Sequence, residues 1–374
     1  MGAKILVTGG AGFIGSHLVD ALLKKGHDVT IFDNLDPQVH GRGGRIPSYV
    51  NKEAKFIKGD VRNREKLKKA VKGIDVIFHQ GACVGIGQSM YEIEKYMYVN
   101  TAGTATLLDI LINESNKVKK LLVASSMSIY GEGSYVCDKC GIVYPSLRSD
   151  KQLESREWEM KCPECNKTAK PIPTKEGKPL FPTSIYAISK RDQEEMSLVV
   201  GRAYKIPVVA LRYFNTYGPR QALSNPYTGA AAIFSSRILN NKPPVIFEDG
   251  YQSRDFVHVS DIVQANMLAM EKREADYEAF NVGTGRMLTI LDLVNILIKK
   301  LEFDKEAVVT KKFRAGDIRH CYADITKIKE RLGFTPKVRF EDGTEDLIKW
   351  VKTQKSKDLF EKAKKELEKK RLTL

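Results

Sequence analysis

Residues 4–18 read KILVTGGAGFIGSHL, which combines an apolar strand, a glycine-rich turn and the beginning of a helix. Gly9, Gly12 and Gly15 permit a tight bend, a close approach of the backbone to a pyrophosphate, and close packing of the helix on the strand. The helix N-terminus favours the negative charge of the phosphates. The stretch therefore predicts a dinucleotide site, in which we include Gly9, Gly12, Phe13, Ile14 and Gly15. A tight turn that serves packing alone is the alternative.

An acidic residue closes the second predicted strand and bears on the choice of dinucleotide. Asp33 would accept hydrogen bonds from both hydroxyls of the adenosine ribose and would repel a 2′-phosphate. No basic residue follows it directly, since its neighbour is Asn34. We therefore expect NAD rather than NADP, held in part by Asp33 and Asn34.

The first two hundred residues alternate short apolar runs with amphipathic stretches, which is typical of βαβ units on a parallel sheet. Strands are expected at 4–8, 28–32, 54–58, 76–79, 121–125 and 208–212. Apolar residues recur at helical spacing over 17–25, 64–72, 100–113 and 185–204. The fold class is therefore α/β, with a doubly wound parallel sheet of the Rossmann type.

The turns after the third and fourth predicted strands are expected to meet the same cofactor. Asp60 and Val61 would place a carboxylate near the adenine amine. Gly81 and Ala82 would allow the cofactor to lie close to the fourth strand.

After residue 215 the expected elements become shorter, and the loops between them are rich in Pro, Gly and Asn. We expect a Rossmann domain over 1–215 and a smaller C-terminal α/β substrate-binding domain over 216–352, with some exchange of segments between them. A charged C-terminal helix is expected over 353–374. Its alternating charges suggest a solvent-exposed helix that carries no chemistry.

A Tyr-x-x-x-Lys motif, Tyr186 to Lys190, lies on a predicted helix, and Ser126 ends a predicted strand. Positions four apart share one helical face, so the Lys190 ammonium can lie beside the Tyr186 phenol. A nearby positive charge favours the phenolate and lowers the pKa of Tyr186 from about 10. Tyr186 would then serve as a general base. Alone, such a pair is also compatible with an ordinary surface helix.

Together these motifs resemble those of the extended short-chain dehydrogenase/reductases, the NAD-dependent epimerase/dehydratase family, and among them the UDP-glucose and UDP-N-acetylglucosamine 4-epimerases. The resemblance implies that Tyr186 removes a proton from a sugar hydroxyl, that Lys190 also holds the nicotinamide ribose, and that Ser126 hydrogen-bonds the reacting oxygen. It implies that Asn100 helps to order the helix carrying the tyrosine. The cofactor site that it implies also includes Asn100, Ser125, Tyr186, Lys190 and Tyr213.

The segment around the serine discriminates between the chemistries of this family. The resembled 4,6-dehydratases carry Thr-Asp-Glu there, because elimination of water needs an additional acid and base, whereas this sequence reads Ser126-Met127-Ser128. The resemblance therefore implies an NAD-dependent 4-epimerase that acts through a transient 4-keto sugar on a UDP-hexose or UDP-N-acetylhexosamine. Another nucleotide-sugar epimerase, a reductase or a dehydratase are the alternatives.

Later segments match the substrate side of the resembled family. Asn215 corresponds to an asparagine that contacts the sugar diphosphate, Arg254 and Arg314 to arginines that clamp the diphosphate, and Asp317 to an aspartate that holds the nucleotide ribose. Guanidinium groups suit this task because they bind phosphate oxygens in pairs. Cys321 stands where a small residue accompanies N-acetylhexosamine substrates, which favours a roomy pocket. A buried structural cysteine is the alternative.

Four of the six cysteines form two Cys-x-x-Cys pairs, namely Cys137 with Cys140 and Cys162 with Cys165. Four thiolates at this spacing can form a closed tetrahedral site for a structural zinc ion. Relative to the resembled family, both pairs lie in extra chain between the serine and the tyrosine. We therefore expect an inserted zinc ribbon over 134–175, which staples an active-site loop.

The formal net charge of +15 could attract polyanions, so nucleic acid and membrane surfaces are partners to consider. Much of the excess lies in solvated Lys-rich helical patterns, so we do not expect nucleic acid, and a basic surface also suits an anionic small substrate. The sequence shows no signal-peptide pattern and no apolar run of about 20 residues. We expect a soluble, cytoplasmic protein that binds a nucleotide sugar and, by resemblance, forms a homodimer.

A function from another class is also compatible with the sequence. The chain could be a non-catalytic NAD-binding scaffold whose zinc ribbon binds RNA or a partner protein. The presence of the serine, the tyrosine and the lysine together favours the enzyme.

Overall fold

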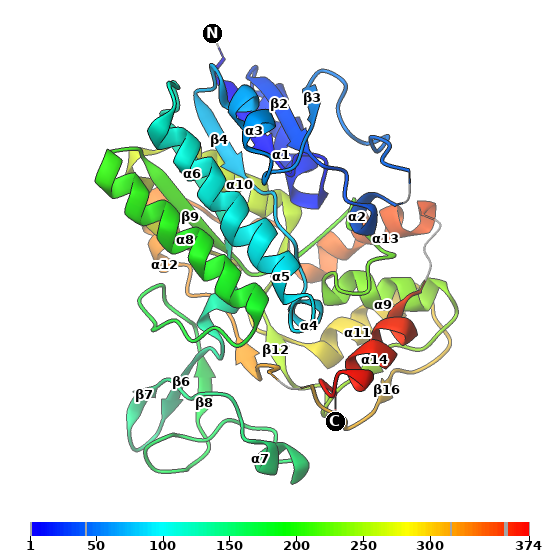
Figure 1. Cartoon of the computed structure of the whole chain (residues 1–374). Helices are drawn as coiled ribbons and strands as arrows, with labels where there is room; N and C mark the ends of the chain where they lie inside the picture. Colours follow the sequence, from blue (N-terminus) through cyan, green and yellow to red (C-terminus); the bar gives the residue numbers. More distant parts are fainter. Residues whose placement is uncertain (1, 42, 315, 355–357, 374) are drawn as a thin grey trace.

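A seven-stranded, wholly parallel sheet forms the centre of the computed structural model, which describes residues 2–41, 43–314, 316–354 and 358–373 (Figure 1). The strand order is β14-β9-β5-β4-β1-β2-β3. The strands are β1 (Lys4–Thr8), β2 (Asp28–Asp33), β3 (Lys55–Lys58), β4 (Val76–His79), β5 (Lys120–Ser126), β9 (Val208–Tyr213) and β14 (Glu278–Val282). The predicted fold class is confirmed.

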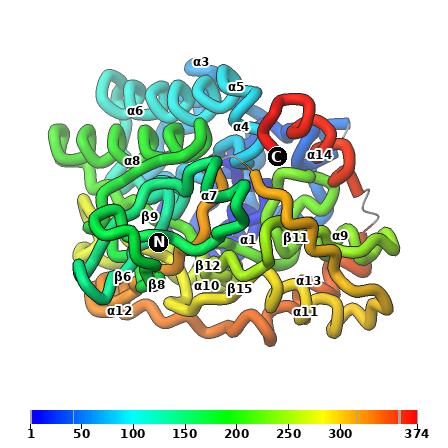
Figure 2. Tube along the Cα trace, turned by 90° about the horizontal axis from the view of Figure 1, so that it is seen from below, coloured from blue at the N-terminus to red at the C-terminus, as the bar shows by residue number. Residues whose placement is uncertain are grey.

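Helices cover both faces of this sheet, which explains why every residue of β4, β5 and β9 is buried. One face packs against α3 (Arg64–Val71), α6 (Gly103–Asn113) and α8 (Ile185–Tyr204). The other packs against α1 (Phe13–Lys24), α10 (Val259–Glu271) and α12 (Thr326–Leu332). Figure 2 shows these two layers on opposite sides of the sheet. Short helical turns connect them, namely α2 (Pro37–His40), α4 (Ile86–Ser89), α5 (Ile93–Tyr96), η1 (Met97–Ala102), η2 (Met127–Tyr130) and η3 (Arg273–Ala275).

The chain crosses between the two parts of the molecule more than once. Strand β14 pairs with β9 at the sheet edge, although it lies far beyond residue 215. Helices α10 and α12, from the same later part of the chain, cover one sheet face. Val257, Ile262 and Phe280 therefore share one core cluster with Ile5 and Leu18. The expected exchange of segments thus supplies part of the central sheet.

The smaller part of the molecule is built around α9 (Ala230–Leu239), α11 (Ile290–Lys300) and α13 (Phe340–Thr353), which pack against one another. Its core includes Tyr217, Phe256 and Phe340. Three small sheets complete it, formed by β10 (Asn215–Tyr217) with β13 (Phe256–His258), by β11 (Val245–Ile246) with β16 (Val308–Val309), and by β15 (Leu288–Thr289), β12 (Ser253–Arg254) and β17 (His320–Cys321). None of the described helices has the length and apolar character needed to cross a membrane.

The insertion at 134–175 forms a separate small sheet below the central one (Figure 1). Its core contains Tyr135, Val143 and Met160 together with two of the cysteines. Its elements are β6 (Ser134–Cys137), β7 (Gly141–Val143), α7 (Asp150–Glu154) and β8 (Lys170–Ile172). The antiparallel pairing of β6 with both β7 and β8 brings the two ends of the insertion together.

The C-terminal helix differs from its expected description. Helix α14 spans Phe360–Lys369, while residues 355–357 and 374 of the expected stretch lie outside the described residues. Ala363 and Leu367 are buried rather than solvent-exposed. The alternating charges predicted exposure on all sides, but the apolar residues at 360, 363 and 367 share one helical face. The helix therefore packs on the molecule with that face.

Candidate active site

A deep cleft of about 810 Å³ runs along the carboxyl ends of the central strands and under the smaller part of the molecule. This is the edge at which open α/β sheets bind ligands. Nearly all of the predicted site residues line the cleft. They are Gly9, Gly12, Phe13, Ile14, Gly15, Asp33, Asn34, Asp60, Val61, Gly81, Ala82, Ser125, Ser126, Tyr186, Lys190, Tyr213, Asn215, Arg254, Arg314 and Asp317. Asn100 and Cys321 do not line it.

The glycine-rich turn is fixed by close contacts that exclude side chains. Gly9 has φ +67°, and a Cβ atom on it would lie 2.8 Å from Cα of Gly81. A Cβ atom on Gly15 would lie 2.2 Å from the carbonyl oxygen of Gly9. Helix α1 begins after Gly12, which provides no side-chain cap for the first N–H groups. The turn therefore fits a dinucleotide whose pyrophosphate takes the place of a cap.

Two carboxylates stand at the expected adenosine end of the cleft. Asp33 is 6% exposed and accepts hydrogen bonds from the backbone N–H groups of Ala11 at 3.0 Å and Leu35 at 2.8 Å. The imidazole Nε2 of His40, which sequence reasoning missed, lies 3.6 Å from Asp33 Oδ1. These contacts hold the Asp33 carboxylate in one orientation at the end of β2.

Asp60 is held by neighbours that were only partly foreseen. Arg62 donates two hydrogen bonds of 2.8 Å to its carboxylate, and Asn34 Nδ2 donates a third at 3.0 Å. The Arg62 bonds are the main reason that the pKa of Asp60 falls to about 2. Asp60 is therefore ionised throughout the physiological range and can accept hydrogen bonds from a ligand.

Helix α8 brings the proposed catalytic pair to the cleft. The helix begins after Ser184, whose side chain accepts a hydrogen bond from the Ala187 N–H, and this cap fixes its first turn. Tyr186 is 9% exposed and lines the cleft together with Ser126. Lys190 is 4% exposed and donates a 2.7 Å hydrogen bond to the carbonyl oxygen of Ala124. The three residues of the motif therefore meet at the end of β5.

The expected lowering of the pKa of Tyr186 is not found. Burial raises the pKa of Tyr186 to about 12, which outweighs the opposing effect of the neighbouring Ser126 side chain. Burial also lowers the pKa of Lys190 to about 7. The predicted shift rested on the attraction between the two charges. Desolvation acts against it, because burial disfavours the charged form of each group.

Asn100 acts on the catalytic helix from behind the cleft wall. It is fully buried in η1, where its Nδ2 donates to Ser189 Oγ at 2.9 Å and to the Cys83 carbonyl oxygen at 3.0 Å. Ser189 Oγ in turn donates to the Tyr186 carbonyl oxygen at 2.8 Å. Asn100 therefore lies where it can order α8, as expected, but the inclusion of Asn100 among cofactor-contacting residues does not fit its burial.

The substrate end of the cleft holds the predicted polar groups. The Oδ1 atom of Asn215 is buried and has no hydrogen-bond partner among the described residues. Arg314 pairs with Asp317 through an Nη2 to Oδ2 distance of 2.7 Å, and its guanidinium lies over the ring of Phe247. Arg254 donates hydrogen bonds to three backbone carbonyl groups of β12 and the β17 segment.

Cys321 is buried outside the residues that line the cleft. Its side chain is 1% exposed, and its Sγ atom lies 3.8 Å from Oγ1 of Thr174 at the base of the insertion. The paired strand β12 and the base of the insertion enclose this position. The alternative of a buried structural cysteine therefore fits the structure, and the roomy pocket stays a prediction.

The C-terminal segment supplies part of the cleft wall, which the sequence analysis did not foresee. Five of its side chains line the cleft, namely Phe360, Ala363, Lys364, Leu367 and Leu372. The segment is fastened at its start, where Asp358 pairs with Arg237 at 3.5 Å and with Lys242 at 3.1 Å. It is fastened at its end by a β-bridge between Thr373 and Arg314. The helical spacing of its apolar residues was the signal that could have located it.

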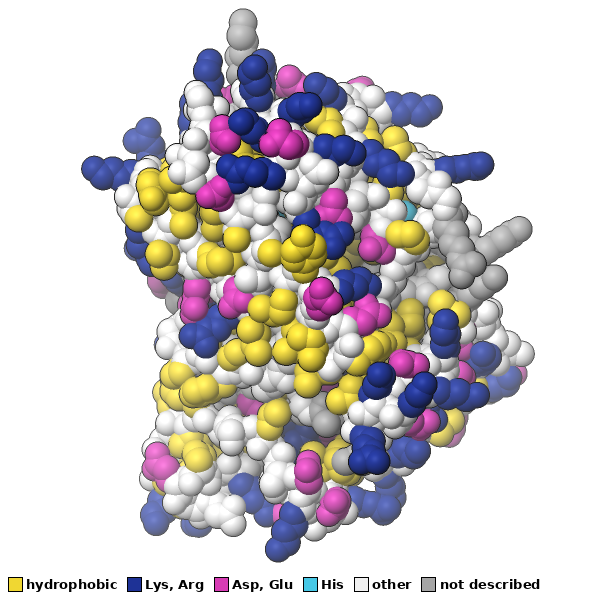
Figure 3. All heavy atoms as spheres, viewed as in Figure 1, with side chains coloured by type: hydrophobic (Ala, Val, Ile, Leu, Met, Phe, Trp, Pro, Cys, Tyr) yellow, Lys and Arg dark blue, Asp and Glu magenta, His cyan; other side chains and the backbone are white. Residues whose placement is uncertain are grey.

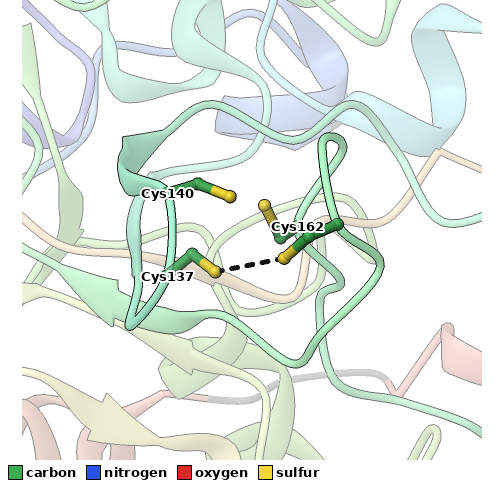
Figure 4. Close-up of side chains that lie close together, drawn as sticks. Cys137, Cys140 and Cys162 are labelled. Carbon is green, nitrogen blue, oxygen red and sulfur yellow. Dashed lines mark hydrogen bonds between the residues drawn. The ribbon is translucent and has the colours of Figure 1, made fainter.

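The four predicted metal ligands come together in the insertion (Figure 4). The sulfur atoms of Cys137, Cys140, Cys162 and Cys165 all lie within 4.8 Å of one another, and none of the four is in a disulfide. A tetrahedral zinc site with Zn–S bonds of about 2.3 Å has sulfurs about 3.8 Å apart. The residues after each pair, Gly141 and Asn166, have φ values of +77° and +58°, which turn the chain tightly around the cluster. The donor set and geometry fit one zinc ion.

Comparison with known proteins gives matches along almost the whole chain. Residues 5–148 match the NAD dependent epimerase/dehydratase family, and residues 167–347 match the GDP-mannose 4,6 dehydratase family. A dTDP-L-rhamnose 4-epimerase from Burkholderia thailandensis is 33% identical over 352 residues, covering 94% of this chain and 95% of the relative.

Solved structures agree with this relationship. A UDP-N-acetylglucosamine 4-epimerase from Methanobrevibacter ruminantium, in complex with UDP-N-acetylmuramic acid, is 32% identical with a TM-score of 0.76, covering 95% of this chain and 99% of that chain. A UDP-glucuronic acid 4-epimerase from Bacillus cereus, in complex with UDP-glucuronic acid and NAD, is 28% identical with a TM-score of 0.73, covering 93% and 99%.

Proposed function

This chain belongs to the NAD-dependent epimerase/dehydratase family, and we propose that it is a nucleotide-sugar 4-epimerase acting through a transient 4-keto sugar. The observation that carries the proposal is the meeting of Ser126, Tyr186 and Lys190 at the cleft, with Met127 and Ser128 in place of the acid pair expected of a dehydratase. The relatives named above include 4-epimerases, which also favours position 4. The proposed substrate is a UDP-hexose or UDP-N-acetylhexosamine.

The catalytic residues have distinct tasks in this mechanism. Gly9, Gly12 and Gly15 would hold NAD along the glycine-rich turn, where the bound cofactor would supply a hydride acceptor and donor for C4 of the sugar. Tyr186 accepts the proton of the 4-hydroxyl group on its phenolic oxygen, while Ser126 hydrogen-bonds the same sugar oxygen. The 4-keto sugar turns over in the cleft, so the hydride would return to the opposite face of C4 and invert its configuration, while Tyr186 returns the proton to the 4-oxygen.

Burial of the Tyr186 and Lys190 pair shapes the proton transfer. Each group alone is disfavoured in its charged form, but an ammonium and a phenolate formed together attract each other strongly in a cleft that excludes water. A charged Lys190 therefore makes the phenolate of Tyr186 accessible. In this mechanism Lys190 also hydrogen-bonds the nicotinamide ribose.

The substrate end of the cleft suits an anionic diphosphate. Arg254 and Arg314 provide guanidinium groups, which bind phosphate oxygens through paired N–H donors. Asn215 offers a buried polar atom that lacks a partner among the described residues. Asp317 would hold the nucleotide ribose.

We propose that the cysteine cluster binds one structural zinc ion, since four sulfur ligands leave no position for water. Metal analysis of the purified protein should find one zinc per chain. Cys162→Ser should lose the metal and destabilise the insertion, while Cys83→Ser, outside the cluster, should retain it. A folded and active protein that contains no metal would contradict a structural zinc.

We also propose a homodimer formed through α6 and α8. Figure 3 shows apolar side chains in a band across this face of the molecule, and Tyr98, Val199 and Tyr204 are more than half exposed. Val199→Asp should shift the mass measured by light scattering from dimer to monomer. An unchanged mass would count against this interface.

The decisive experiment is incubation with a panel of UDP- and dTDP-sugars without added NAD, with the products separated by stereochemistry. A 4-epimer should form without release of NADH. Tyr186→Phe should lower kcat by about 10²–10⁴-fold while retaining NAD and UDP binding. Tyr204→Phe, on the exposed face of the same helix, is the matched control and should behave as wild type. Normal turnover by Tyr186→Phe, or stoichiometric NADH, would refute the mechanism.

A further inference from the structure

The insertion contacts the substrate end of the molecule through a set of charged side chains that we call the charged cluster. Its members are Arg148 and Glu159 from the insertion, Glu248 and Asp249 from the loop between β11 and β12, and Arg319 next to β17. The side chains of Arg148 and Arg319 are each 1% exposed, and that of Glu248 is 4% exposed. Glu159 and Asp249 are 47% and 29% exposed, and the three buried members join the insertion to the substrate end through directional hydrogen bonds.

Arg148 links the insertion to the substrate end at two points. Its two Nη atoms lie 2.9 Å and 2.8 Å from the two carboxylate oxygens of Glu248. The Nη2 atom also donates to the carbonyl oxygen of Asp317 at 3.2 Å. The arginine of the insertion therefore holds both the loop before β12 and the backbone of the segment that contains Asp317.

Arg319 gathers three carboxylates around one guanidinium group. It bonds Glu248 at 2.9 Å, Asp249 at 2.7 Å and Glu159 at 2.6 Å. Its neighbour His320 contacts Glu159 through Nε2 at 3.1 Å and Ser253 Oγ through Nδ1 at 2.7 Å. These contacts fix the position of the backbone at 318–320.

That backbone sets the orientation of Arg254. Arg254 donates from Nη1 to the carbonyl oxygens of Ser253 at 2.7 Å and Arg319 at 3.0 Å, and from Nη2 to that of Ile318 at 2.7 Å. Among the described residues these are its only hydrogen bonds, and they leave the Nε–H and the second Nη2–H along one edge of the guanidinium. Such an edge is the paired donor that a phosphate group requires.

We propose that the insertion is a positioning element for the substrate diphosphate, with Arg148 and Glu159 acting through the charged cluster to aim Arg254. This inference rests on the proposed function for the contact between Arg254 and phosphate. The insertion thereby sets the affinity for the nucleotide and leaves the hydride and proton chemistry at Tyr186 unchanged. A buried ion pair adds little stability compared with apolar packing, so its contribution at such an interface is to fix the relative positions of the groups.

The test compares Arg148→Met with Arg156→Met, since Arg156 is an exposed arginine of the same insertion. Calorimetric titration with UDP and with dTDP gives an affinity that does not depend on turnover. Arg148→Met should weaken binding of the preferred nucleotide at least tenfold and raise KM in parallel, with kcat and NAD content within about twofold of wild type. Arg156→Met should match wild type.

A double-mutant cycle shows whether the effect passes through Arg254. In the Arg254→Ala background, Arg148→Met should have little further effect, because neighbours that act through one group are not additive. Glu159→Gln, whose side chain is 47% exposed, should fold in any case and should weaken binding more modestly. Unchanged nucleotide affinity in both Arg148→Met and Glu159→Gln would overturn the inference. So would a double variant in which the fold-losses of affinity from Arg148→Met and Arg254→Ala multiply fully.

The outcomes also separate this inference from the proposed function. A wild-type protein that binds UDP or dTDP but epimerises no sugar would refute the proposed function and leave the affinity comparison valid. A wild-type protein that binds neither nucleotide would overturn both.

Discussion

A buried ion pair and its hydrogen bonds connect the catalytic helix with the neighbouring strands. Glu194 and Arg212 form a buried ion pair, with side chains 3% and 7% exposed. Glu194 also accepts a 2.6 Å hydrogen bond from Ser125, and Arg212 donates one of 2.7 Å to the Tyr130 hydroxyl. This network links the catalytic helix α8 to strand β5, which carries Ser125, and to strand β9, which carries Arg212.

Glu194→Gln should destabilise the protein by about 3–5 kcal/mol, because it leaves the Arg212 charge buried without its partner. The neighbouring variant Glu195→Gln is a strict control, since Glu195 forms an exposed pair with Arg191 on the same helix. Its expected cost is below about 0.5 kcal/mol. Urea unfolding of the two variants would measure the difference, and similar costs would contradict the importance of the buried pair.

The lowered pKa of Lys190 predicts a pH dependence of stability. In the unfolded chain a lysine titrates near pH 10.4, whereas burial lowers the pKa of Lys190 to about 7. Between these values the unfolded state binds more protons than the folded state, so stability rises as the pH increases from about 7 to about 10. Lys178, lowered to about 8 by burial, acts in the same direction.

Lys190→Met should therefore reduce the gain in stability between about pH 7 and about pH 9 in the nucleotide-free protein. Lys178 would still contribute part of the gain. Urea midpoints of the variant and wild type at the two pH values provide the measurement. An identical gain in both proteins would show that Lys190 titrates normally when folded.

Residues of this kind mark the limit of what the sequence reveals. The glycines, Tyr186 and the cysteines were located because their chemistry depends on local spacing. Glu194 reads as one more polar residue on an amphipathic helix, and only the fold places Arg212 beside it. The pKa of Tyr186 was misjudged for the same reason, because burial is a property of the tertiary structure.

At the scale of elements, α14 combines a charged exterior with an apolar face that closes the cleft. Leu367 is 8% exposed and lies close to Gly87 in α4, while Glu361 of the same helix pairs with Arg237 of α9 at 3.0 Å. The helix therefore joins segments from both parts of the molecule. It forms an apolar boundary for a ligand bound below it.

Leu367→Asp should raise KM for the nucleotide sugar by about tenfold or more, since it removes a buried leucine worth about 1.5–3 kcal/mol and places a charge beside an anionic ligand. Lys365→Asp introduces the same side chain on the exposed face of α14 and serves as the control. Initial rates and NAD content would be measured for both. Equal KM values would exclude α14 from the substrate site.

Local elements were predicted well where a strong periodic pattern coincided with burial. The helix expected at 185–204 is α8 with the same bounds, and all six expected strands are present within one or two residues. The helix expected at 100–113 begins earlier, with a π-helical turn at η1 that places Asn100 against α8. Such a turn depends on the packing of the two helices and has no marker in the sequence.

At the scale of the whole molecule, segments on both sides of the expected boundary at 215 pack into one core. The outer face of α1, with Leu18 and Val19, lies in the same core as Ile262 and Ala265 of α10. Strand β14 completes the sheet edge beside β9. Pairings over such long sequence separations cannot be read from local patterns.

A fragment of residues 1–215 should therefore fail to fold into a stable domain, although it contains six of the seven sheet strands. The missing α10 would expose the apolar face of α1, and the missing β14 would leave β9 as an unpaired edge. Size-exclusion chromatography should show aggregation, and thermal melting should lack the cooperative transition of the full chain. A monomeric fragment with a sharp transition would show that the later segments are dispensable.

The insertion leaves and rejoins the rest of the chain at neighbouring points, since Ser134 pairs with Ile172 across β6 and β8. Chain ends that lie side by side tolerate excision and replacement, so the module could be exchanged at those two points if the replacement supplied a partner for the buried Glu248. A lineage could acquire or lose the whole module in a single genetic event without moving the catalytic serine relative to the tyrosine. The same junction is a natural graft point at which a protein engineer could install a different module and so change ligand affinity independently of the reaction.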